Sequence, residues 1–329
     1  MSSFLLWTDP HFTDNPIDEY RWDIFASLAE LCFKYEVDEI VCLGDVVDRK
    51  DRHTGLLVNR LVQNFTTLKS VTNTEIKIIS GNHEKPVTGP YFWEFFNKIG
   101  IDYLIYPLKF SSIWYLPFSA NPVEEWKDLD LASASVILMH QTGQGARVEG
   151  DRELTSNNLP KFPNIQIFSG DVHRPQEVEG ITYIGTPHPV RFSETWNNRV
   201  IVIEDDNFKK PISVWLPSIK RAIVDITSSK ELDTLSYKEG DQVRVRYTIS
   251  GKKLADWPEE QEAIRKWAKS REVYIASLEP KFIGDGVQVE TNTEALALEL
   301  MSPDEIVIKF GKDEKLTADV IEVGRQLLK

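Results

Sequence analysis

Short apolar runs recur along the first two thirds of the chain, and a glycine or a polar residue follows each of them. They occupy residues 4–7, 40–43, 76–79, 136–139 and 165–168. Runs of this length and composition are typical of strands buried on both faces of a sheet. Between the first runs, apolar residues recur at three- and four-residue steps over residues 20–35, which predicts an amphipathic helix. A second helix is expected over about residues 54–68.

The order of these elements predicts an α/β protein. Strand and helix alternate up to residue 80, which indicates βαβ units and a mainly parallel sheet. From residue 113 onward the strands lie closer together and are joined by turns such as Glu179-Gly180. This spacing favours either a mixed sheet or a second sheet packed on the first.

The pattern restarts after residue 217 and predicts a small α+β module over residues 218–300. Arg244 and Arg246 alternate with apolar residues, as on a strand with one exposed face. A separate helical segment is expected over residues 301–329, with a capping box at its start. The elements expected within the module are strands at 222–226, 243–249 and 272–278, and a helix opened by Pro258.

Composition and charge narrow the class of protein. The 329 residues include 38 Lys and Arg against 51 Asp and Glu, a formal charge of −13, which disfavours a protein that coats nucleic acid non-specifically. Bound cations in an enzyme site would offset part of that charge. Cys32 and Cys42 lack disulfide or metal-site spacing and are expected to be core thiols in a reducing compartment. No signal peptide or membrane-spanning run is evident, so a soluble, intracellular protein is expected.

Polar residues follow each apolar run at the point where the strand ends. Since ligands gather at the carboxyl ends of strands in α/β sheets, these side chains are expected at one edge of one sheet. Such a gathering of carboxylates, imidazoles and an amide predicts a metal site, and a double one. The predicted ligands are Asp9, His11, Asp45, Asn82, His140, Asp171 and His173.

Residue chemistry indicates which ions would bind. Asp45 is the candidate bridge, because the glycine before it lets the backbone turn sharply after the strand. Asp9 and His11 are two residues apart and point the same way in an extended segment. Mixed imidazole and oxygen ligands suit Mn²⁺ or Fe²⁺ better than a structural Zn²⁺. Two such ions about 3.5–4 Å apart clamp a phosphate and lower the pKa of a water between them.

The motifs, taken in order, resemble those of calcineurin-like metallophosphoesterases. They are Asp-x-His at residue 9, Gly-Asp-x-x-Asp at 44, Gly-Asn-His-Glu at 81, a lone histidine at 140 and Gly-x-x-His at 170. Within that family the chain is similar to the nuclease subunit of the SbcCD recombination complex and its phage counterparts. The resemblance implies a layered α/β/β/α sandwich over residues 1–217, followed by a capping domain that would position DNA.

The resemblance also implies a role for each site residue. One cation would take Asp9, His11 and His173, the other Asn82 and His140, with Asp45 shared. Asp171 stands where the family has a histidine, and it is expected to be a ligand of the second cation. Further roles are expected as follows: His83 faces the phosphate and stabilises charge or protonates the leaving 3′ oxygen, Asp48 either orients His83 or is a surface acid, and Glu84 caps a turn.

Several basic residues are candidates for contact with a phosphate backbone, although each alone is more often a surface charge. These are Arg52, Arg147, Arg174 and Arg191. His53 is expected in a solvated loop, and His188 in a loop beside the site.

The function expected from the resemblance is a DNA exonuclease or endonuclease dependent on Mn²⁺, or on Mg²⁺. It would act in recombination, repair and replication with an SbcC-like coiled-coil ATPase subunit, as a homodimer without a membrane, in bacterial cytoplasm or that of a phage-infected host. A serine/threonine phosphoprotein phosphatase is the alternative, since residues 44–49 also resemble that branch. The Gly-Asn-His-Glu motif at residue 81 resembles that branch as well, but Ser80 replaces the arginine expected directly before it, which argues against a phosphatase. A non-catalytic scaffold is a third class, disfavoured by the ligand set.

Overall fold

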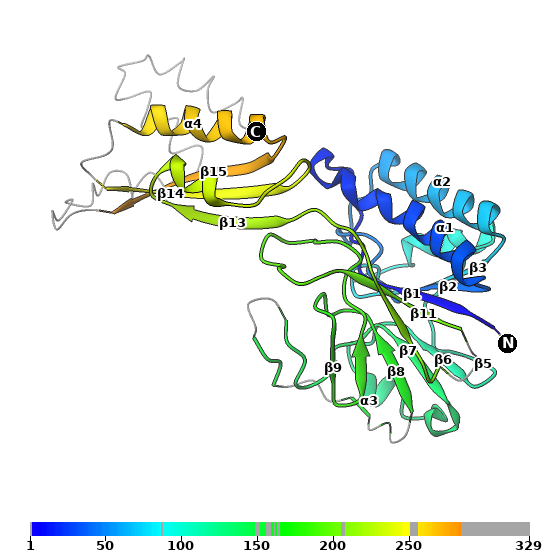
Figure 1. Ribbon diagram of the computed structural model, residues 1–329. Helices are drawn as coiled ribbons and strands as arrows, with labels where there is room; N and C mark the ends of the chain where they lie inside the picture. The colour runs from blue at the N-terminus through cyan, green and yellow to red at the C-terminus, as the bar shows by residue number, and fades with distance from the viewer. Residues whose placement is uncertain are drawn as a thin grey trace, which may run out of the picture.

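The computed structural model describes residues 2–86, 88–148, 152–155, 159–160, 162, 165–204, 208–250 and 256–283. Two sheets pack face to face with helices on the outside, and a third sheet lies in a separate module (Figure 1). The expected α/β class and layered sandwich are confirmed. The capping box and helix expected within residues 301–329 lie outside the described residues.

The first sheet is parallel in its centre, as the alternation of strand and helix predicts. β1 to β4 run parallel, while β11 and β12 add an antiparallel edge in the order β12-β11-β1-β2-β3-β4. The strands are β1 (Phe4–Trp7), β2 (Glu39–Cys42), β3 (Glu75–Ile79), β4 (Asp102–Leu104), β11 (Arg199–Ile203) and β12 (Ile212–Trp215).

Two helices cover the outer face of this sheet. α1 (Ile24–Tyr35) begins later than the sequence pattern predicts, because the preceding residues form a 3₁₀ helix, η1 (Pro16–Asp23), opened by the Asn15 cap and Pro16. α2 (Gly55–Thr72) is capped by the Thr54 side chain and extends four residues beyond its predicted end.

The sequence favoured either a mixed sheet or a second sheet. The structure has both features, because a second sheet is present and it is mixed. Its order is β5-β6-β7-β8-β10-β9, with parallel central strands and antiparallel edges. The strands are β5 (Leu108–Phe110), β6 (Ile113–Leu116), β7 (Val136–Met139), β8 (Gln166–Ser169), β9 (Gln176–Val178) and β10 (Ile181–Tyr183). Of the shorter helices, η2 (Phe92–Ile99) packs on the first sheet, where Trp93 and Phe96 join the cluster beneath α1 and α2, whereas α3 (Pro122–Glu125) and η3 (Leu131–Ser133) lie beside the second sheet.

Strand β1 shows why the apolar runs are continuous rather than alternating. Leu5 and Trp7 pack into the cluster beneath α1 and α2, whereas Phe4 and Leu6 pack between the two sheets. Because successive side chains of a strand point to opposite faces, a strand buried on both faces must be apolar throughout. The ends of paired strands are also level: Trp7 pairs with Cys42, and Met139 with Ser169. The loops that follow therefore leave from the same edge of each sheet.

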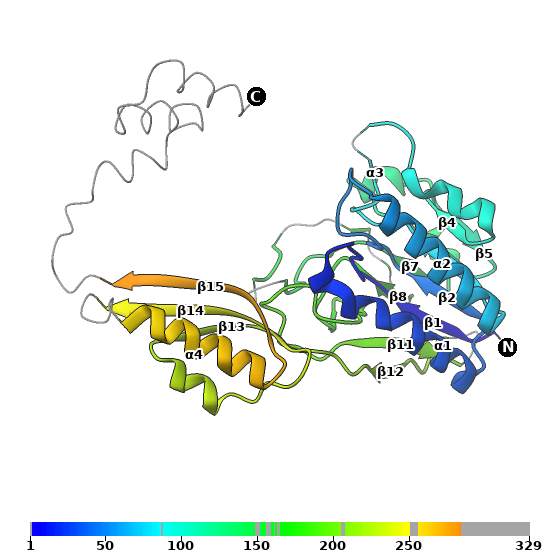
Figure 2. The ribbon, with the colours of Figure 1, turned by 90° about the horizontal axis from the view of Figure 1, so that it is seen from above.

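The module after the sandwich is a three-stranded parallel sheet covered by a helix on one face (Figure 2). Arg244 and Arg246 lie exposed on β14 between buried apolar residues, as predicted. The predicted boundary near residue 217 falls between β12 and the first strand of this sheet. Its elements are β13 (Arg221–Ile226), η5 (Ser229–Thr234), β14 (Gln242–Ser250), α4 (Trp257–Ser270) and β15 (Tyr274–Ile283).

Two sequence-based expectations concern the chain as a whole. Cys32 and Cys42 are both buried and do not form a disulfide, as expected of core thiols. In the described residues, the helices are each too short or too polar to span a membrane.

A polar contact ties the two sheets together through their shared core. The Tyr115 hydroxyl on β6 donates to Glu39 Oε1 on β2 at 2.8 Å, and Lys77 Nζ on β3 lies 2.6 Å from Glu39 Oε2. The Glu39 and Lys77 side chains are each 12% exposed. Burial, with the charge of Glu39, raises the pKa of Tyr115 and keeps it a hydrogen-bond donor.

Removing this hydroxyl should loosen the contact between the sheets. Tyr115→Phe leaves one Glu39 oxygen without its donor, and hydrogen bonds to charged groups contribute about 1.5–3 kcal/mol, so a loss of that order in unfolding free energy is expected. Denaturant unfolding measures it. Tyr106→Phe is the control, because Tyr106 is 74% exposed. Equal stability of the two variants would contradict the role given to Tyr115.

Candidate metal centre

The loops after β1 and β2 hold each other through main-chain hydrogen bonds. Asp9 N donates to Gly44 O at 3.0 Å, and His11 N donates to Asp45 O at 3.1 Å. Phe12 N then donates to Val46 O at 2.8 Å. These bonds extend the pairing of β1 with β2 past the ends of the strands. They place Asp9, His11 and Asp45 at one edge of the sheet.

Four of the predicted ligands have a left-handed backbone. The φ angles are 52° at Asp9, 45° at His11, 51° at Asp45 and 72° at Asp171. Residues with a side chain avoid this region, and such conformations persist where the surroundings enforce them, often at functional sites. The expectation that Asp9 and His11 lie in an extended segment is therefore wrong, because both residues lie in tight turns after β1.

Two glycines leave room for the central carboxylate. Gly44 has a φ of 101°, which favours glycine directly before Asp45. A Cβ atom at Gly81 would lie 2.2 Å from Asp45 Oδ1. A side chain at residue 81 would therefore displace the carboxylate on which the site is centred.

Glu84 fixes the two loops that meet at Asp45. Its carboxylate accepts hydrogen bonds from the main-chain N–H groups of Asp45 at 3.0 Å, Val47 at 3.1 Å and Gly81 at 2.8 Å. The residue is 5% exposed. The interpretation of Glu84 as a turn cap is confirmed, and it joins two turns rather than one.

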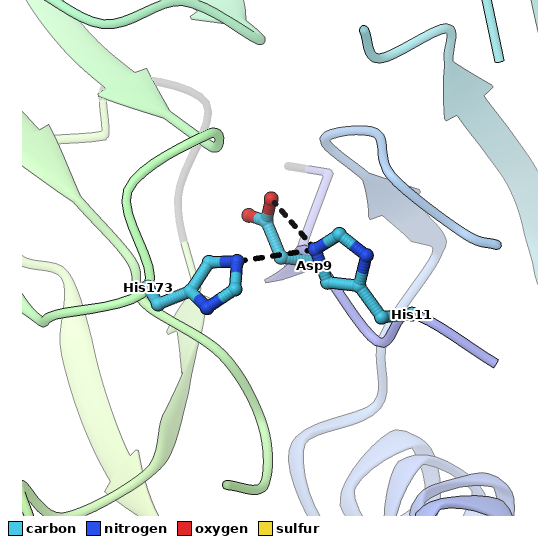
Figure 3. Close-up of side chains that lie close together, drawn as sticks. All are labelled: Asp9, His11 and His173. Atoms are coloured by element: carbon cyan, nitrogen blue, oxygen red, sulfur yellow. Dashed lines mark hydrogen bonds and ion pairs between the residues drawn. The ribbon is translucent and has the colours of Figure 1, made fainter. Parts of the chain in front are cut away.

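One group of ligand atoms comes from Asp9, His11 and His173, which point toward one another (Figure 3). His11 Nε2 lies 3.1 Å from His173 Nε2 and 4.0 Å from Asp9 Oδ1. Asp9 is further held by the Thr8 hydroxyl at 2.5 Å and by the main-chain N–H of Asp171 at 3.1 Å. This is the set expected for the first cation.

A second group comes from Asp9, Asp45 and His140. Asp45 Oδ1 lies 3.3 Å from His140 Nε2, while Asp45 Oδ2 lies 3.7 Å from His11 Nε2. The two oxygens of Asp45 thus face different histidines, as a bridging carboxylate requires. His140 Nε2 also lies 3.7 Å from Asp171 Oδ1, so Asp171 faces the second group.

Hydrogen bonds set which nitrogen of each histidine faces the centre. His140 Nδ1 donates to the main-chain carbonyl of Leu43, and His173 Nδ1 donates to Glu194 Oε1 at 2.5 Å. Both imidazoles therefore present Nε2 to the centre. Metal-binding histidines commonly use the other ring nitrogen in this way, which fixes the ring orientation and raises its basicity.

Two of the predicted ligands carry a buried atom whose lone pair no described group satisfies, and one of them, Asn82, directly precedes His83, whose main-chain N–H donates to Asp45 Oδ1 at 2.9 Å. Asn82 Oδ1 and His140 Nε2 are both buried without a hydrogen-bond partner among the described residues. Leaving a buried polar atom unpaired costs about 1–3 kcal/mol. A cation satisfies both, and an amide oxygen beside carboxylates suits a hard divalent ion. The residues therefore fit a pair of divalent cations.

The electrostatics of the centre favour added positive charge. Burial raises the pKa of Asp45 well above its usual range, and the nearby carboxylates of Glu84, Asp9 and Asp171 raise it further. Burial disfavours the charged form of His140, but Asp45 and Asp9 outweigh this effect and raise the pKa of His140 to about 9. Several acids thus share one dry site, which divalent cations would neutralise.

His83 is hydrogen-bonded to the main chain of Asp48 and not to its carboxylate, which the sequence offered as the group that orients His83. His83 Nδ1 donates to the main-chain carbonyl of Asp48 at 2.6 Å, whereas the Asp48 carboxylate lies 3.8 Å from His11 Nδ1. Burial lowers the pKa of His83, and the Asp48 carbonyl and charge oppose that shift. His83 Nε2 lies 3.8 Å from Asp45 Oδ2, so His83 borders the centre.

A hollow of about 730 Å³ opens beside Asp171 and His173. Of the four arginines proposed to contact DNA, Arg174 and Arg191 line it, while Arg52 and Arg147 are exposed elsewhere. The rest of its described lining is Thr142, Val148, Arg152, Leu154, Ser193, Glu194 and Trp196.

The two remaining histidines are more buried than the sequence suggests. His53 packs against the rings of Phe92 and Trp93, with centroids 4.7 and 4.8 Å away. His188 is 5% exposed and donates from Nε2 to Pro10 O at 2.8 Å; burial lowers its pKa to about 3. Neither belongs to the ligand groups described above.

Glu194 is the main site residue that the sequence did not reveal. It lies 21 residues after His173, in a segment without a motif, and no spacing links the two. Burial opposes a charge on His173, but the hydrogen bond that His173 donates to Glu194 and the charge of that carboxylate raise the pKa of the imidazole. Only the folded chain places this carboxylate behind the ligand.

Comparison with known proteins identifies the family of the chain. The family model described as calcineurin-like phosphoesterase matches residues 2–175, more than half of the chain. No curated protein matches the chain. Among solved structures, a nuclease from Pseudomonas putida is 12% identical, with a TM-score of 0.32 over 60% of this chain and 83% of its own. A dimetal phosphatase from Danio rerio is 11% identical, with a TM-score of 0.37 over 66% of this chain and 99% of its own. The chain belongs to the calcineurin-like phosphoesterase family and is a hydrolase that acts on phosphoesters.

Proposed function

We propose that the protein is a DNA nuclease that hydrolyses phosphodiester bonds with two divalent cations, Mn²⁺ or Mg²⁺. The observation that carries the proposal is the placement of Asp45, one of whose oxygens faces His11 and the other His140. A carboxylate shared in this way belongs to a two-cation centre. Such a centre orients a phosphate and makes hydroxide available for in-line attack.

The ligands divide between two cations. One cation would be held by Asp9, His11, His173 and Asp45. The other would be held by Asp45, Asn82, His140 and Asp171, of which Asn82 offers an unpaired buried oxygen. Replacing the family's histidine by Asp171 adds a hard oxygen donor and a negative charge, which favours Mn²⁺ or Mg²⁺ over softer ions.

His83 is the side chain proposed to act on the phosphate charge or the leaving oxygen. His83 borders the centre at Asp45, and its Nδ1–H is used by the Asp48 carbonyl, so Nε2 is the atom available to the substrate. Protonated at Nε2, it stabilises charge on the phosphate or donates a proton to the leaving 3′ oxygen. The main-chain carbonyl, not the Asp48 carboxylate, sets its orientation.

The hollow beside Asp171 supports a nucleic acid over a phosphoprotein as substrate. Its lining combines Arg152, Arg174 and Arg191 with Trp196. Arginines recognise phosphate oxygens, and an aromatic ring offers a stacking surface for a base. The appended three-stranded module also favours the nuclease over the serine/threonine phosphatase, which remains the alternative.

The partners follow from the resemblance to the SbcCD nuclease subunit. We propose that the protein works as a homodimer with an SbcC-like coiled-coil ATPase in DNA recombination, repair and replication. The protein would be located in the bacterial cytoplasm, or in the host cytoplasm if a phage encodes it. Co-purification with such an ATPase tests the partner. Light scattering, which measures the mass of the isolated protein, tests the dimer.

Substrate class is tested directly with end-labelled duplex DNA and a phosphoserine peptide. Digestion of the DNA is expected with Mn²⁺ and, more weakly, with Mg²⁺, and none is expected with chelator. The peptide should release no phosphate under the same conditions. Dephosphorylation of the peptide without cleavage of DNA would overturn the nuclease proposal in favour of the phosphatase.

His83→Ala is expected to lower cleavage while leaving metal binding intact. General acid catalysis contributes about 10²–10⁴-fold, so a loss of that size is expected. Asp48→Asn is the matched control, because its main-chain carbonyl still orients His83, and it should lose far less activity. Calorimetric titration with Mn²⁺ checks that His83 does not bind metal. Its ring nitrogens lie close to His11 and Asp45, so weaker Mn²⁺ binding by His83→Ala would show that His83 is a ligand.

Asp171 is tested by substitution with alanine and with histidine. Asp171→Ala removes an oxygen donor from the second cation and should reduce the stoichiometry from two tightly bound Mn²⁺ ions to one, with most activity lost. Asp171→His restores the residue typical of the family and should retain activity with Mn²⁺. Two tightly bound ions and normal cleavage in the alanine variant would show that Asp171 is not a ligand.

A further inference from the structure

A pair of buried arginines joins the module to the metal centre. Arg21 in η1 is 3% exposed, and Arg221 at the start of β13 is 7% exposed. Both reach Asp18 Oδ1, Arg21 Nη2 at 2.9 Å and Arg221 Nη2 at 3.5 Å. Both also donate to the main-chain carbonyl of Val190. Two buried cations with one carboxylate between them need these carbonyl contacts, since an unpaired buried charge is costly.

From this pair, one branch leads to His11. Arg21 Nη1 donates to the main-chain carbonyl of His11. His11 has a left-handed backbone that its surroundings must hold in place. A guanidinium on its carbonyl, anchored by Asp18, supplies part of that restraint.

The other branch leads to His173 through residues 190–194. Arg221 holds the Val190 carbonyl, and the Val190 N–H donates to Glu194 Oε2 at 2.6 Å. The other oxygen of Glu194 accepts from His173 Nδ1 at 2.5 Å. One arginine of the module therefore contacts the segment whose glutamate orients a predicted ligand.

The same segment is held by a second residue of the module. The Phe192 ring has the Arg221 guanidinium 4.3 Å and the Arg244 guanidinium 4.4 Å from its centroid. Gln242 Nε2 also donates to the Ile17 carbonyl in η1 at 2.6 Å. The module thus contacts both segments that lead to the metal centre. Arg221, on its first strand, makes the contact with the Val190 carbonyl.

We propose that Arg221 is a positioning residue, through which the module sets the geometry of His173 by way of Val190 and Glu194. The module then has a role in the chemistry itself, apart from any contact it makes with DNA. Loss of Arg221 leaves Asp18 and the Val190 carbonyl paired with Arg21, so the fold and the restraint on His11 persist, while the Val190 carbonyl loses one of its two arginine donors. The proposal rests on the metal centre assigned under the proposed function.

The first test uses metal-free protein, so it does not depend on that function. In Arg221→Gln, hydrogen exchange of the Val190 amide should be at least about 10-fold faster than in the wild type, because the contact of Arg221 with the Val190 carbonyl holds that residue against Glu194. The His11 amide should exchange as in the wild type, because its branch runs through Arg21. Arg246→Gln is the matched control on the same sheet, since Arg246 lies 3.7 Å from Glu279 on an exposed face. Wild-type exchange at the Val190 amide in Arg221→Gln would overturn the proposal.

The second test measures metal and turnover. Changes in groups that orient metal ligands typically cost about 10–100-fold in affinity or activity, so Mn²⁺ binding by Arg221→Gln should weaken by that factor. With bis(p-nitrophenyl) phosphate, too small to reach the module, kcat should fall and KM should change little. Arg221→Lys keeps the charge beside Asp18 and should be intermediate in every measurement.

The outcomes separate this inference from the proposed function. A wild-type protein that binds no Mn²⁺ would refute the metal centre, while the exchange test would still decide whether Arg221 restrains Val190. Wild-type Mn²⁺ affinity in Arg221→Gln would overturn the inference and leave the nuclease intact. Should the glutamine variant not fold, Arg221→Lys takes its place, and wild-type exchange at the Val190 amide there would overturn the proposal as well.

Discussion

The structure depends on keeping several acids close together away from water. Asp9, Asp45 and Glu84 are nearly or fully buried at the edge where the two sheets meet. Each would be unfavourable alone, and each is placed so that a particular group offsets its charge. Glu84 accepts three main-chain N–H groups, Asp9 accepts the Thr8 hydroxyl and the Asp171 N–H, and Asp45 faces His11 and His140. The sandwich provides the rigid edge that makes this crowding possible.

Much of this arrangement can be predicted from the amino-acid sequence alone. Apolar runs such as residues 4–7 predict strands buried on both faces, because no polar residue interrupts them. Parallel pairing then brings Asp9, Asp45 and Asn82 to one edge, and the second sheet adds His140 and His173. Residue type together with position at a strand end is sufficient, since the geometry of parallel strands converts order along the chain into proximity.

The remaining features depend on contacts that carry no local pattern. The hydrogen bond from His83 goes to the carbonyl of Asp48, and a main-chain conformation of this kind leaves no trace in residue identity. Glu194 orients His173 from a segment without a motif, and Arg221 reaches Asp18 from more than 200 positions away. The 3₁₀ helix before α1 also escapes the periodic pattern, because its apolar positions fit an α-helix equally well. Tertiary contacts decide each of these.

The hydrogen bonds between the loops of Asp9 and Asp45 have a consequence for the order of folding. The two loops are separated in the chain by α1 and β2, and they support each other's left-handed turns. Neither turn is favoured in isolation, so neither is expected to persist until β1 and β2 have paired and their ends are level. The turns are therefore formed after the sheet that carries them. The metal centre is assembled late, and a chain that binds cations tightly has already paired β1 with β2.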